Sequence, residues 1–515
     1  MHLALVSWIL FTLLVVILSL CQVKNKGKKR SDEVKLPPGP RKLPIIGNIH
    51  NLMMGSLPQQ ALTNLARKHG DLIHLQLGEV STIVASSAQL AKEILKTNGT
   101  AFANRPEFLV GKIILYNYSD ITFAPYGDYW RQMRKICILE LLSSKNVRSF
   151  GSIRQDEALQ LVSSIREEAT TSHGSKRPVN VTQKISSYTS SVICRAVFGR
   201  AFGRHRDILL QLVKEVVVRS SGFDVSDIFP SWKILHYFSS KPKMLQLRNK
   251  IDKILDTVIQ EHVENRARTK TGYGDFGQED LIDVLLRVQE IGDLQFPITN
   301  NNIKAILIDM FTAGSESSYI VVEWAMTEMM RNPRVLVKAQ SELRKALPLE
   351  KRTIEETDIH KVSYLKLVIK ETLRLHFPTA LILRENIGEC EIDGYVIPPK
   401  TRVLINAWAI ARDSRYWEDP ESFIPERFED NSVDFIGTSY EFLPFGSGRR
   451  ICPGISFGIS IIEVPLANLL YYFDWKLPDD PNNTSLDMTE TYGLAAAKKN
   501  NLLLVPSMYE SLGTL

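Results

Sequence analysis

The spacing of apolar residues predicts that most of this chain is helical. Apolar residues recur every three or four positions in 57–70 and in 87–99, and both segments end in glycine. Between them, apolar and polar residues alternate in 72–86. This pattern predicts two strands joined by a turn at Gly78 and Glu79. Helical spacing then returns in 126–142, 153–170, 181–200, 206–220 and 244–267.

The second half of the chain completes the expected fold. Residues 301–333 are apolar on nearly every side, which predicts a long buried helix that ends at Asn332-Pro333. After residue 380 the pattern changes to short strands and turns. The interior of the sequence has no linker rich in proline, serine or glycine and no repeat of fixed period. We therefore expect a single domain over 49–515 that is mainly α with small β-sheets.

The first segment is long and apolar enough to cross a membrane. Residues 3–23 carry no charge, and a helix of this length spans about 32 Å, close to the apolar thickness of a bilayer. The alternative is a cleaved signal peptide, which would need a basic start and a small-residue cleavage site. Here the cations follow the apolar run, so we expect a single-pass anchor with the body in the cytosol. The basic and proline-rich segment 24–48 predicts a stiff hinge.

Charge and cysteine content exclude several classes of protein. The 515 residues include 63 basic and 57 acidic side chains, and five of the cations lie in 24–30. The net charge of +6 is therefore one local cluster beside the predicted anchor, and we expect no nucleic-acid binding. The five cysteines are far apart and show no metal-ligand spacing, so neither a disulfide framework nor a structural zinc site is expected.

Polar residues interrupt the apolar helix near its middle. Gly314 costs about 1 kcal/mol relative to alanine inside a helix, and Ser315, Glu316 and two more serines follow it. Two interpretations are equal on these residues alone. One is a groove for a small ligand with a proton-relay pair, and the other is a glycine that lets a second helix pack closely beside a solvated acidic end.

Two further motifs combine charge with apolar surroundings. Glu371 and Arg374 are three positions apart and share one face of an apolar helix, which predicts a buried ion pair, although a surface salt bridge is the common alternative. Cys452 lies on a turn with several glycines and with Arg449 and Arg450, ahead of an amphipathic helix. Nearby cations favour a thiolate, and one thiolate without other protein ligands suits a metal held by a macrocycle. An inert buried cysteine remains the alternative.

Taken together, these motifs resemble those of the cytochrome P450 family. Residues 445–454 match its haem-binding signature F-x-x-G-x-R-x-C-x-G, and 371–374 match its E-x-x-R. Residues 425–428 match its P-E-R-F segment, 313–318 its oxygen-activation motif, and 130–134 its W-x-x-x-R. The motifs occur in family order along nearly the whole chain. The resemblance implies the P450 fold, with haem between the long central helix and the helix that follows the cysteine.

The resemblance also implies roles for individual residues. Cys452 would be the axial ligand of haem b, and Glu316 and Ser317 would deliver protons to bound oxygen. The haem carboxylates would be held by Trp130, Arg134, Arg384 and Arg450. The cysteine turn would be held in place by three structural residues, Glu371, Arg374 and Arg427. Five apolar residues lie in segments that contact substrate in the family: Ile113, Ile114, Leu115, Ala313 and Leu383.

Residues 43–48, 123–137 and 406–417 resemble the corresponding segments of plant microsomal members of the family, and those of the terpene-oxidising members most. This implies insertion of one oxygen atom of O2 into a hydrophobic plant metabolite, with a terpenoid favoured and an alkaloid or phenolic as the alternative. Electrons would come from NADPH through a flavin reductase in the endoplasmic reticulum membrane, docked near Arg131 and Lys135. A reductase-independent haem-thiolate isomerase is disfavoured by Glu316 and Ser317. A non-catalytic haem protein, or a membrane protein with a structural thiol and no haem, leaves the oxygen motif unexplained.

Two departures from the family pattern concern the site directly. Ser317 stands where the family usually has threonine, which keeps the hydroxyl but leaves its rotamer less fixed. We therefore expect retained oxygenation with looser proton coupling. The segment 376–385 is about one residue short and lacks a usual proline before Arg384, so the pocket beside Leu383 is expected to differ in shape.

Overall fold

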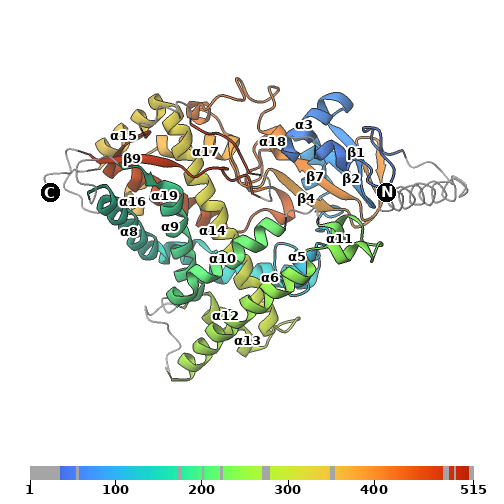
Figure 1. Cartoon of the computed structure of the whole chain (residues 1–515), viewed down its shortest axis with the longest axis horizontal. Coiled ribbons are helices and arrows are strands. Elements are labelled where there is room, and N and C mark those ends of the chain that lie inside the picture. The colour runs from blue at the N-terminus through green and yellow to red at the C-terminus, as the bar shows by residue number, and fades with distance from the viewer. Residues whose placement is uncertain are drawn as a thin grey trace, which may run out of the picture.

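The computed structural model describes residues 35–53, 57–170, 177–199, 202–220, 224–268, 279–347, 354–478, 486–491 and 495–509 (Figure 1). The predicted membrane anchor at 3–23 and the cationic cluster at 24–30 lie outside these residues. Helices make up most of the described chain and the strands form small sheets, as the sequence predicted.

One long helix organises the helical part of the molecule. α14 (Asn300–Arg331) runs through the middle and packs against α9 (Val181–Phe198), α17 (Tyr364–Leu375) and α19 (Ile455–Tyr472) (Figure 1). It begins at a capping box formed by Thr299 and Asn302 and ends at Asn332, before Pro333. The remaining longer helices are α3 (Pro58–His69), α6 (Asp128–Ile136), α8 (Gly151–Thr170), α10 (Gly203–Arg219), α12 (Lys241–Arg268), α13 (Leu281–Ile291) and α15 (Pro333–Ala346).

Among the described residues, α14 and α19 are the two helices whose length and apolarity would let them cross a membrane. Most of each helix is buried inside the protein, and α14 is covered by α9, α17 and α19. Both are therefore helices of the protein core.

A mixed sheet lies beside the helices. Its strand order is β1-β2-β7-β4, with β2 and β7 parallel and the other two pairs antiparallel. These strands are β1 (Leu72–Leu77), β2 (Val80–Ala85), β4 (Leu381–Glu385) and β7 (Arg402–Asn406). The smaller sheets contain β3 (Val179–Asn180), β9 (Leu503–Met508) and β8 (Phe473–Lys476) in one case, and β5 (Cys390–Ile392) and β6 (Tyr395–Ile397) in the other.

Part of the proline-rich segment is bound to the edge of this sheet. Gly47 forms a β-bridge with Leu77, and the side chain of Asn48 accepts a hydrogen bond from the Gln76 amide at 2.8 Å. Asn48 is fully buried and also donates to the Pro40 carbonyl at 3.3 Å. The described part of the segment is therefore packed against the body and leaves it in a fixed direction.

Candidate active site

The cysteine turn is shaped by two glycines. Gly446 and Gly448 have φ angles of +70° and +71°, which side chains other than glycine rarely adopt. A Cβ at Gly448 would also overlap the Leu95 carbonyl, so the turn lies directly against the π-helical turn Glu93–Thr97. The Cys452 amide closes the turn by donating to the Phe445 carbonyl at 3.0 Å.

The Cys452 sulfur lies at the start of α19. Burial raises the pKa of the Cys452 thiol, and the Gly454 backbone N–H and the Arg134 guanidinium oppose that rise. The side chain nevertheless keeps some accessible surface. A bound metal cation would favour the thiolate form of this side chain.

Two arginines and a tryptophan form a layered contact beside the turn. The Trp130 ring lies 4.2 Å from the Arg450 guanidinium and 5.3 Å from that of Arg134. Arg134 donates to the Ile451 carbonyl at 2.6 Å, and Trp130 donates its Nε1–H to the Ile121 carbonyl at 2.9 Å. The ring therefore orders the two guanidiniums, while its own N–H is occupied by the backbone.

Two more arginines complete a cationic cluster. Arg384 on β4 and Arg105 both donate to the Leu383 carbonyl. Burial lowers the pKa of Arg384 well below its usual value, and Arg105, Arg450 and Arg134 lower it further. None of these four side chains forms an ion pair with a carboxylate in the described part of the chain. Four crowded guanidiniums without a direct carboxylate partner in the described chain suit a ligand that carries carboxylates.

Arg105 is a site residue that sequence reasoning missed. It lies in the irregular segment before α5 (Leu109–Ile113), where no helical or strand spacing marks it. Its only sequence signal is the following Pro106, which predicts an extended backbone and says nothing about what the side chain contacts. Burial lowers the pKa of Arg105 to about 10, although Asp120 and Asp309 oppose this.

Asp309 is a second missed residue and fixes the loop beside the arginines. Its carboxylate accepts hydrogen bonds from the amides of Ile121 and Thr122, at 3.2 and 3.1 Å, and from the Thr122 hydroxyl at 2.6 Å. The Ile121 carbonyl in turn accepts from Trp130 and, at 3.4 Å, from Arg450. Asp309 therefore positions the backbone that receives both side chains.

The middle of α14 has features of both predicted roles, a glycine that packs against another helix and an accessible polar face. A Cβ at Gly314 would overlap Ile193 of α9, so this glycine serves close helix packing. Ala313 and Ser317, one turn apart, are accessible in the middle of this otherwise buried helix. Ser317 donates its hydroxyl to the Ala313 carbonyl at 2.6 Å, and the α-helix continues without a bulge. The accessible face is thus formed by Ala313 and Ser317.

Glu316 points into a polar contact with a neighbouring helix. Burial raises the pKa of its carboxyl group, while Lys214 of α10 and a hydrogen bond with Tyr319 oppose the rise. One carboxylate oxygen is buried without a protein partner in the described chain. The group is therefore poised to hold a proton.

Glu371 and Arg374 are completely buried, as their apolar helix predicted. The two side chains form paired hydrogen bonds of 2.8 and 2.9 Å, and Arg427 joins Glu371 at 3.0 Å. Arg374 also binds the Ala411 and Pro420 carbonyls, both at 2.7 Å. The aromatic rings of Trp417, Phe428 and Phe442 continue from this segment toward the cysteine turn.

The predicted substrate residues lie in different environments. Ile113, Ile114 and Leu115 are buried at the end of α5, and Leu383 is partly buried on β4 beside Arg384. Of the five predicted residues, Ala313 is the one with an exposed side chain. The Ile114 and Leu115 amides both donate to the Val110 carbonyl, at 2.8 and 3.3 Å, so the backbone of this segment is held by α5.

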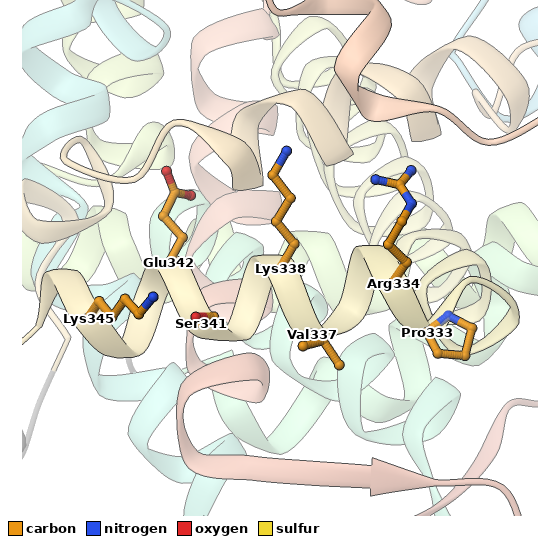
Figure 2. Close-up of a pocket in the computed structure, with 7 residues that line it drawn as sticks. All are labelled: Pro333, Arg334, Val337, Lys338, Ser341, Glu342 and Lys345. Atoms are coloured by element: carbon orange, nitrogen blue, oxygen red, sulfur yellow. The ribbon is translucent and has the colours of Figure 1, made fainter.

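A separate groove on the outer surface follows α15 (Figure 2). It is lined by Pro333, Arg334, Val337, Lys338, Ser341, Glu342 and Lys345. Arg334 and Lys338 bind the carboxylate of Glu426, at 2.5 and 3.2 Å. The cations of this groove therefore fasten the P-E-R-F segment (η5, Pro425–Phe428) to α15.

The combined geometry defines the class of protein. A single cysteine at a helix start, an arginine cluster without a carboxylate ion pair in the described chain and an accessible hydroxyl on a central helix fit haem b, whose iron would be held by Cys452 and whose carboxylates would be bound by the arginines. This is the site of a haem-thiolate protein.

Comparison with known proteins establishes the family. A sequence model of the cytochrome P450 family matches residues 37–505, and the chain belongs to that family. It is 54% identical to premnaspirodiene oxygenase of Hyoscyamus muticus over 93% of this chain and 94% of the relative. It is 52% identical to 5-epiaristolochene 1,3-dihydroxylase of Nicotiana tabacum, over 93% and 94%. Tabersonine 3-oxygenase of Catharanthus roseus is also 52% identical, over 92% and 93%.

A structural comparison supports the same fold. A zebrafish cytochrome P450 solved with progesterone superimposes with a TM-score of 0.72 over 88% of this chain and 100% of the other, at 23% identity. The expected P450 fold is therefore confirmed. The protein is a cytochrome P450 monooxygenase that uses haem b and O2 and acts on a hydrophobic substrate.

Proposed function

We propose that this monooxygenase hydroxylates a terpenoid, in one step or several, at a site bounded by Ala313 and Ser317. The observation that carries the proposal is the accessible Ala313–Ser317 face on a central helix whose surroundings are apolar. Two relatives at 52% and 54% identity have names that give the oxidised compounds as 5-epiaristolochene and premnaspirodiene. An alkaloid is the second candidate, because tabersonine 3-oxygenase is 52% identical.

In this proposal the cysteine turn and the arginine cluster hold the cofactor. Cys452 ligates the iron, and the carboxylates are bound by Arg105, Arg134, Arg384 and Arg450. Trp130 orients Arg134 and Arg450 through its ring, because its N–H is bound to Ile121. Haem held by a thiolate supplies O2 activation, since electron donation from sulfur favours cleavage of the O–O bond. Glu371, Arg374 and Arg427 support the segment that leads to the turn.

Two side chains of α14, Ser317 and Glu316, supply protons in this proposal. The Ser317 hydroxyl holds a proton at Oγ, on the accessible face, and can turn away from the Ala313 carbonyl. Burial raises the pKa of the Glu316 carboxyl, which favours its protonated form, while a hydrogen bond with Tyr319 and the charge of Lys214 on α10 oppose the rise. In this proposal the two side chains supply protons beside the accessible face of α14.

A flavin reductase partner docks at the exposed cations near the cysteine turn. Lys135 on α6 and Arg449 are exposed, whereas Arg131 is paired with Asp128. Reversing the charges of Arg131 and Lys135 should weaken reductase-driven turnover and spare peroxide-driven turnover. Lys345→Glu on α15 is the control and should change neither. Equal loss of both activities in the double variant would contradict docking at this surface.

The protein is anchored in the endoplasmic reticulum membrane by residues 3–23, with 24–48 as the hinge and 49–515 as the cytosolic haem domain. An exposed apolar patch supports this placement: Ile234, Tyr237 and Phe238 are 85%, 86% and 74% exposed. The patch belongs to the segment after α11 (Val225–Ile228). The β1–β2 turn binds both elements, because the Glu79 amide donates to the Ile228 carbonyl at 3.0 Å and the Ser231 amide donates to the Glu79 carboxylate at 2.8 Å. The same turn binds the exposed Ile46 through Gly78 N–H at 3.3 Å.

Co-expression with a plant reductase tests the substrate proposal. Microsomes would be supplied with NADPH, O2 and either premnaspirodiene, 5-epiaristolochene or tabersonine, and products identified by mass spectrometry. Oxygenation of a terpene that stops without reductase is the expected result. Oxygenation of tabersonine alone would favour the alkaloid candidate, and turnover without NADPH would refute the reductase-dependent function. Cys452→Ser should abolish activity and the red-shifted Soret band of the reduced carbon monoxide complex.

A further inference from the structure

A strained turn follows α5 and has no explanation in the chemistry of the haem site. Tyr116, Asn117 and Tyr118 have φ angles of 49°, 59° and 61°, the one run of three consecutive non-glycine residues with positive φ in the described ranges. Asparagine tolerates this left-handed conformation, but tyrosine rarely adopts it. Such strain persists only where surrounding contacts determine it, so the turn is held by its neighbours.

The turn folds back on α5 to make one compact unit. Its Asn117 and Tyr118 amides donate to the Lys112 and Gly111 carbonyls, at 3.1 and 3.0 Å. The Tyr118 ring lies where a Cβ on Gly111 would stand, and its hydroxyl donates to the Phe108 carbonyl at 3.0 Å. Residues 108–119 therefore form one hydrogen-bonded unit, which includes Ile113, Ile114 and Leu115.

Tyr116 ties this unit to two long helices. Its hydroxyl donates to Asp252 of α12, and its ring lies 4.3 Å from the Arg248 guanidinium of the same helix. Lys304 of α14 binds Asp252 at 3.0 Å and lies 5.8 Å from the same ring. Tyr116 is 4% exposed, whereas the side chains of Arg248 and Asp252 are 28% and 25% exposed, so the contact is partly shielded from water.

The other end of the unit is held separately. The Leu109 amide, at the start of α5, donates to the Asp227 carboxylate of α11 at 2.8 Å. The short helix is thus fixed at one end by α11 and at the other by α12 and α14.

We propose that Tyr116 is a positioning residue that sets where Ile113, Ile114 and Leu115 stand toward the substrate. Its contacts with Asp252 and Arg248 offset the strain of the turn and hold α5 in one place. This inference rests on the proposed function, because the contact of these three residues with substrate belongs to that proposal. Loss of the Tyr116 hydroxyl lets α5 relax, which loosens the apolar wall without disturbing the cysteine turn.

The test compares Tyr116→Phe with Tyr118→Phe in the full-length haem-loaded protein. Tyr118→Phe is the matched control, because it loses a hydroxyl hydrogen bond inside the unit but no link to α12. The first readout is amide hydrogen exchange of residues 108–119. The second is the dissociation constant of 1-phenylimidazole, a bulky ligand of haem iron, with cyanide as the small ligand. Both are followed by the absorbance of the haem.

Tyr116→Phe should speed exchange in 108–119 and weaken 1-phenylimidazole binding about three- to tenfold, with cyanide binding and the carbon monoxide spectrum unchanged. Tyr118→Phe should leave ligand binding within about twofold. Unchanged exchange, or equal effects of the two variants on 1-phenylimidazole, would overturn the role of Tyr116. Ile113→Ala separates the two proposals: if it leaves 1-phenylimidazole binding unchanged while exchange still responds to Tyr116→Phe, the substrate role of this segment is wrong and the positioning role falls with it.

Discussion

At the level of single residues, the site depends on carboxylates and hydroxyls that form hydrogen bonds with backbone groups. Asp309 holds three hydrogen bonds to Ile121 and Thr122, and through them it places the carbonyl that Trp130 and Arg450 share. Sequence reasoning identified Trp130 and Arg450 because they belong to spaced motifs. It missed Asp309 because a lone aspartate in an apolar helix carries no spacing that names its partner.

Asp309→Asn should destabilise the protein and loosen haem. The amide keeps one acceptor but introduces donors that face backbone amides, so we expect a loss of about 2–3 kcal/mol in unfolding free energy and faster haem transfer to apomyoglobin. Asp487→Asn is the control, since Asp487 makes similar bonds to Thr489 at an exposed position. Equal behaviour of the two variants would contradict the positioning role of Asp309.

Ser317 allows a prediction about proton coupling. The hydroxyl binds the Ala313 carbonyl as a threonine would, but serine lacks the methyl group that restricts χ1. Ser317→Thr should therefore raise the ratio of product formed to NADPH consumed, and Ser317→Ala should lower it and release more peroxide. The three rates measured in one reconstituted reaction check this. A ratio that does not differ between the serine and alanine enzymes would remove Ser317 from the proton path.

At the level of elements, the sequence predicted what depends on local spacing. The ends of α14, the β1–β2 hairpin and the burial of Glu371 with Arg374 all followed from apolar periodicity and from breakers such as Pro333. The sequence did not predict whether Gly314 faces a ligand or a neighbouring helix. The packing of α9 against this glycine answers that question. The binding of the P-E-R-F segment to α15 was also missed, since Glu426 and Arg334 are far apart in the chain.

The ion pair between Arg334 of α15 and Glu426 of η5 should make the free energy of unfolding fall at acid pH. The hydrogen bond from Arg334, chiefly, lowers the pKa of Glu426 to about 2 from an ordinary value near 4.5. Because the folded-state pKa is the lower one, this stabilisation is fully present above pH 4.5 and is lost as pH falls toward 2. Arg334 is largely exposed, so the effect is about 1 kcal/mol.

Glu426→Gln isolates this contribution. The urea midpoint of the wild type should exceed that of the variant by a constant amount above pH 5, and the difference should shrink between pH 4.5 and 2. Tryptophan fluorescence follows the unfolding. A difference that stays constant through this range would show that the carboxylate charge does not stabilise the fold.

At the level of the whole molecule, two surface segments distant in sequence form one apolar face. Ile46 and the segment after α11 meet at the same β1–β2 turn, and Trp232 lies in that segment. Composition could not predict this face, because its apolar residues are scattered between 43 and 238 and only the fold brings them together. The P450 fold, in contrast, could be predicted from the order of the motifs along the chain.

This face should enter the lipid of a membrane that holds the full-length protein. Lipids brominated in their acyl chains should quench part of the tryptophan fluorescence, and Trp232→Phe should remove that part because Trp232 is half-exposed on the apolar face. Trp475→Phe, which alters a buried ring, is the control and should leave the quenched part intact. Quenching that survives Trp232→Phe unchanged would place this face in water.

The bonds of Arg450 have a consequence for biosynthesis. This side chain, near the end of the chain, donates to the Ala103 carbonyl, 347 positions earlier, and to the Ala124 carbonyl. A nascent chain emerges from the ribosome N-terminus first. Arg105, Arg134 and Arg384 are therefore synthesised before Arg450, the fourth member of the cluster. The complete arginine cluster can therefore form only after residue 450 has been synthesised, and a chain that ends before the cysteine turn lacks both Arg450 and Cys452.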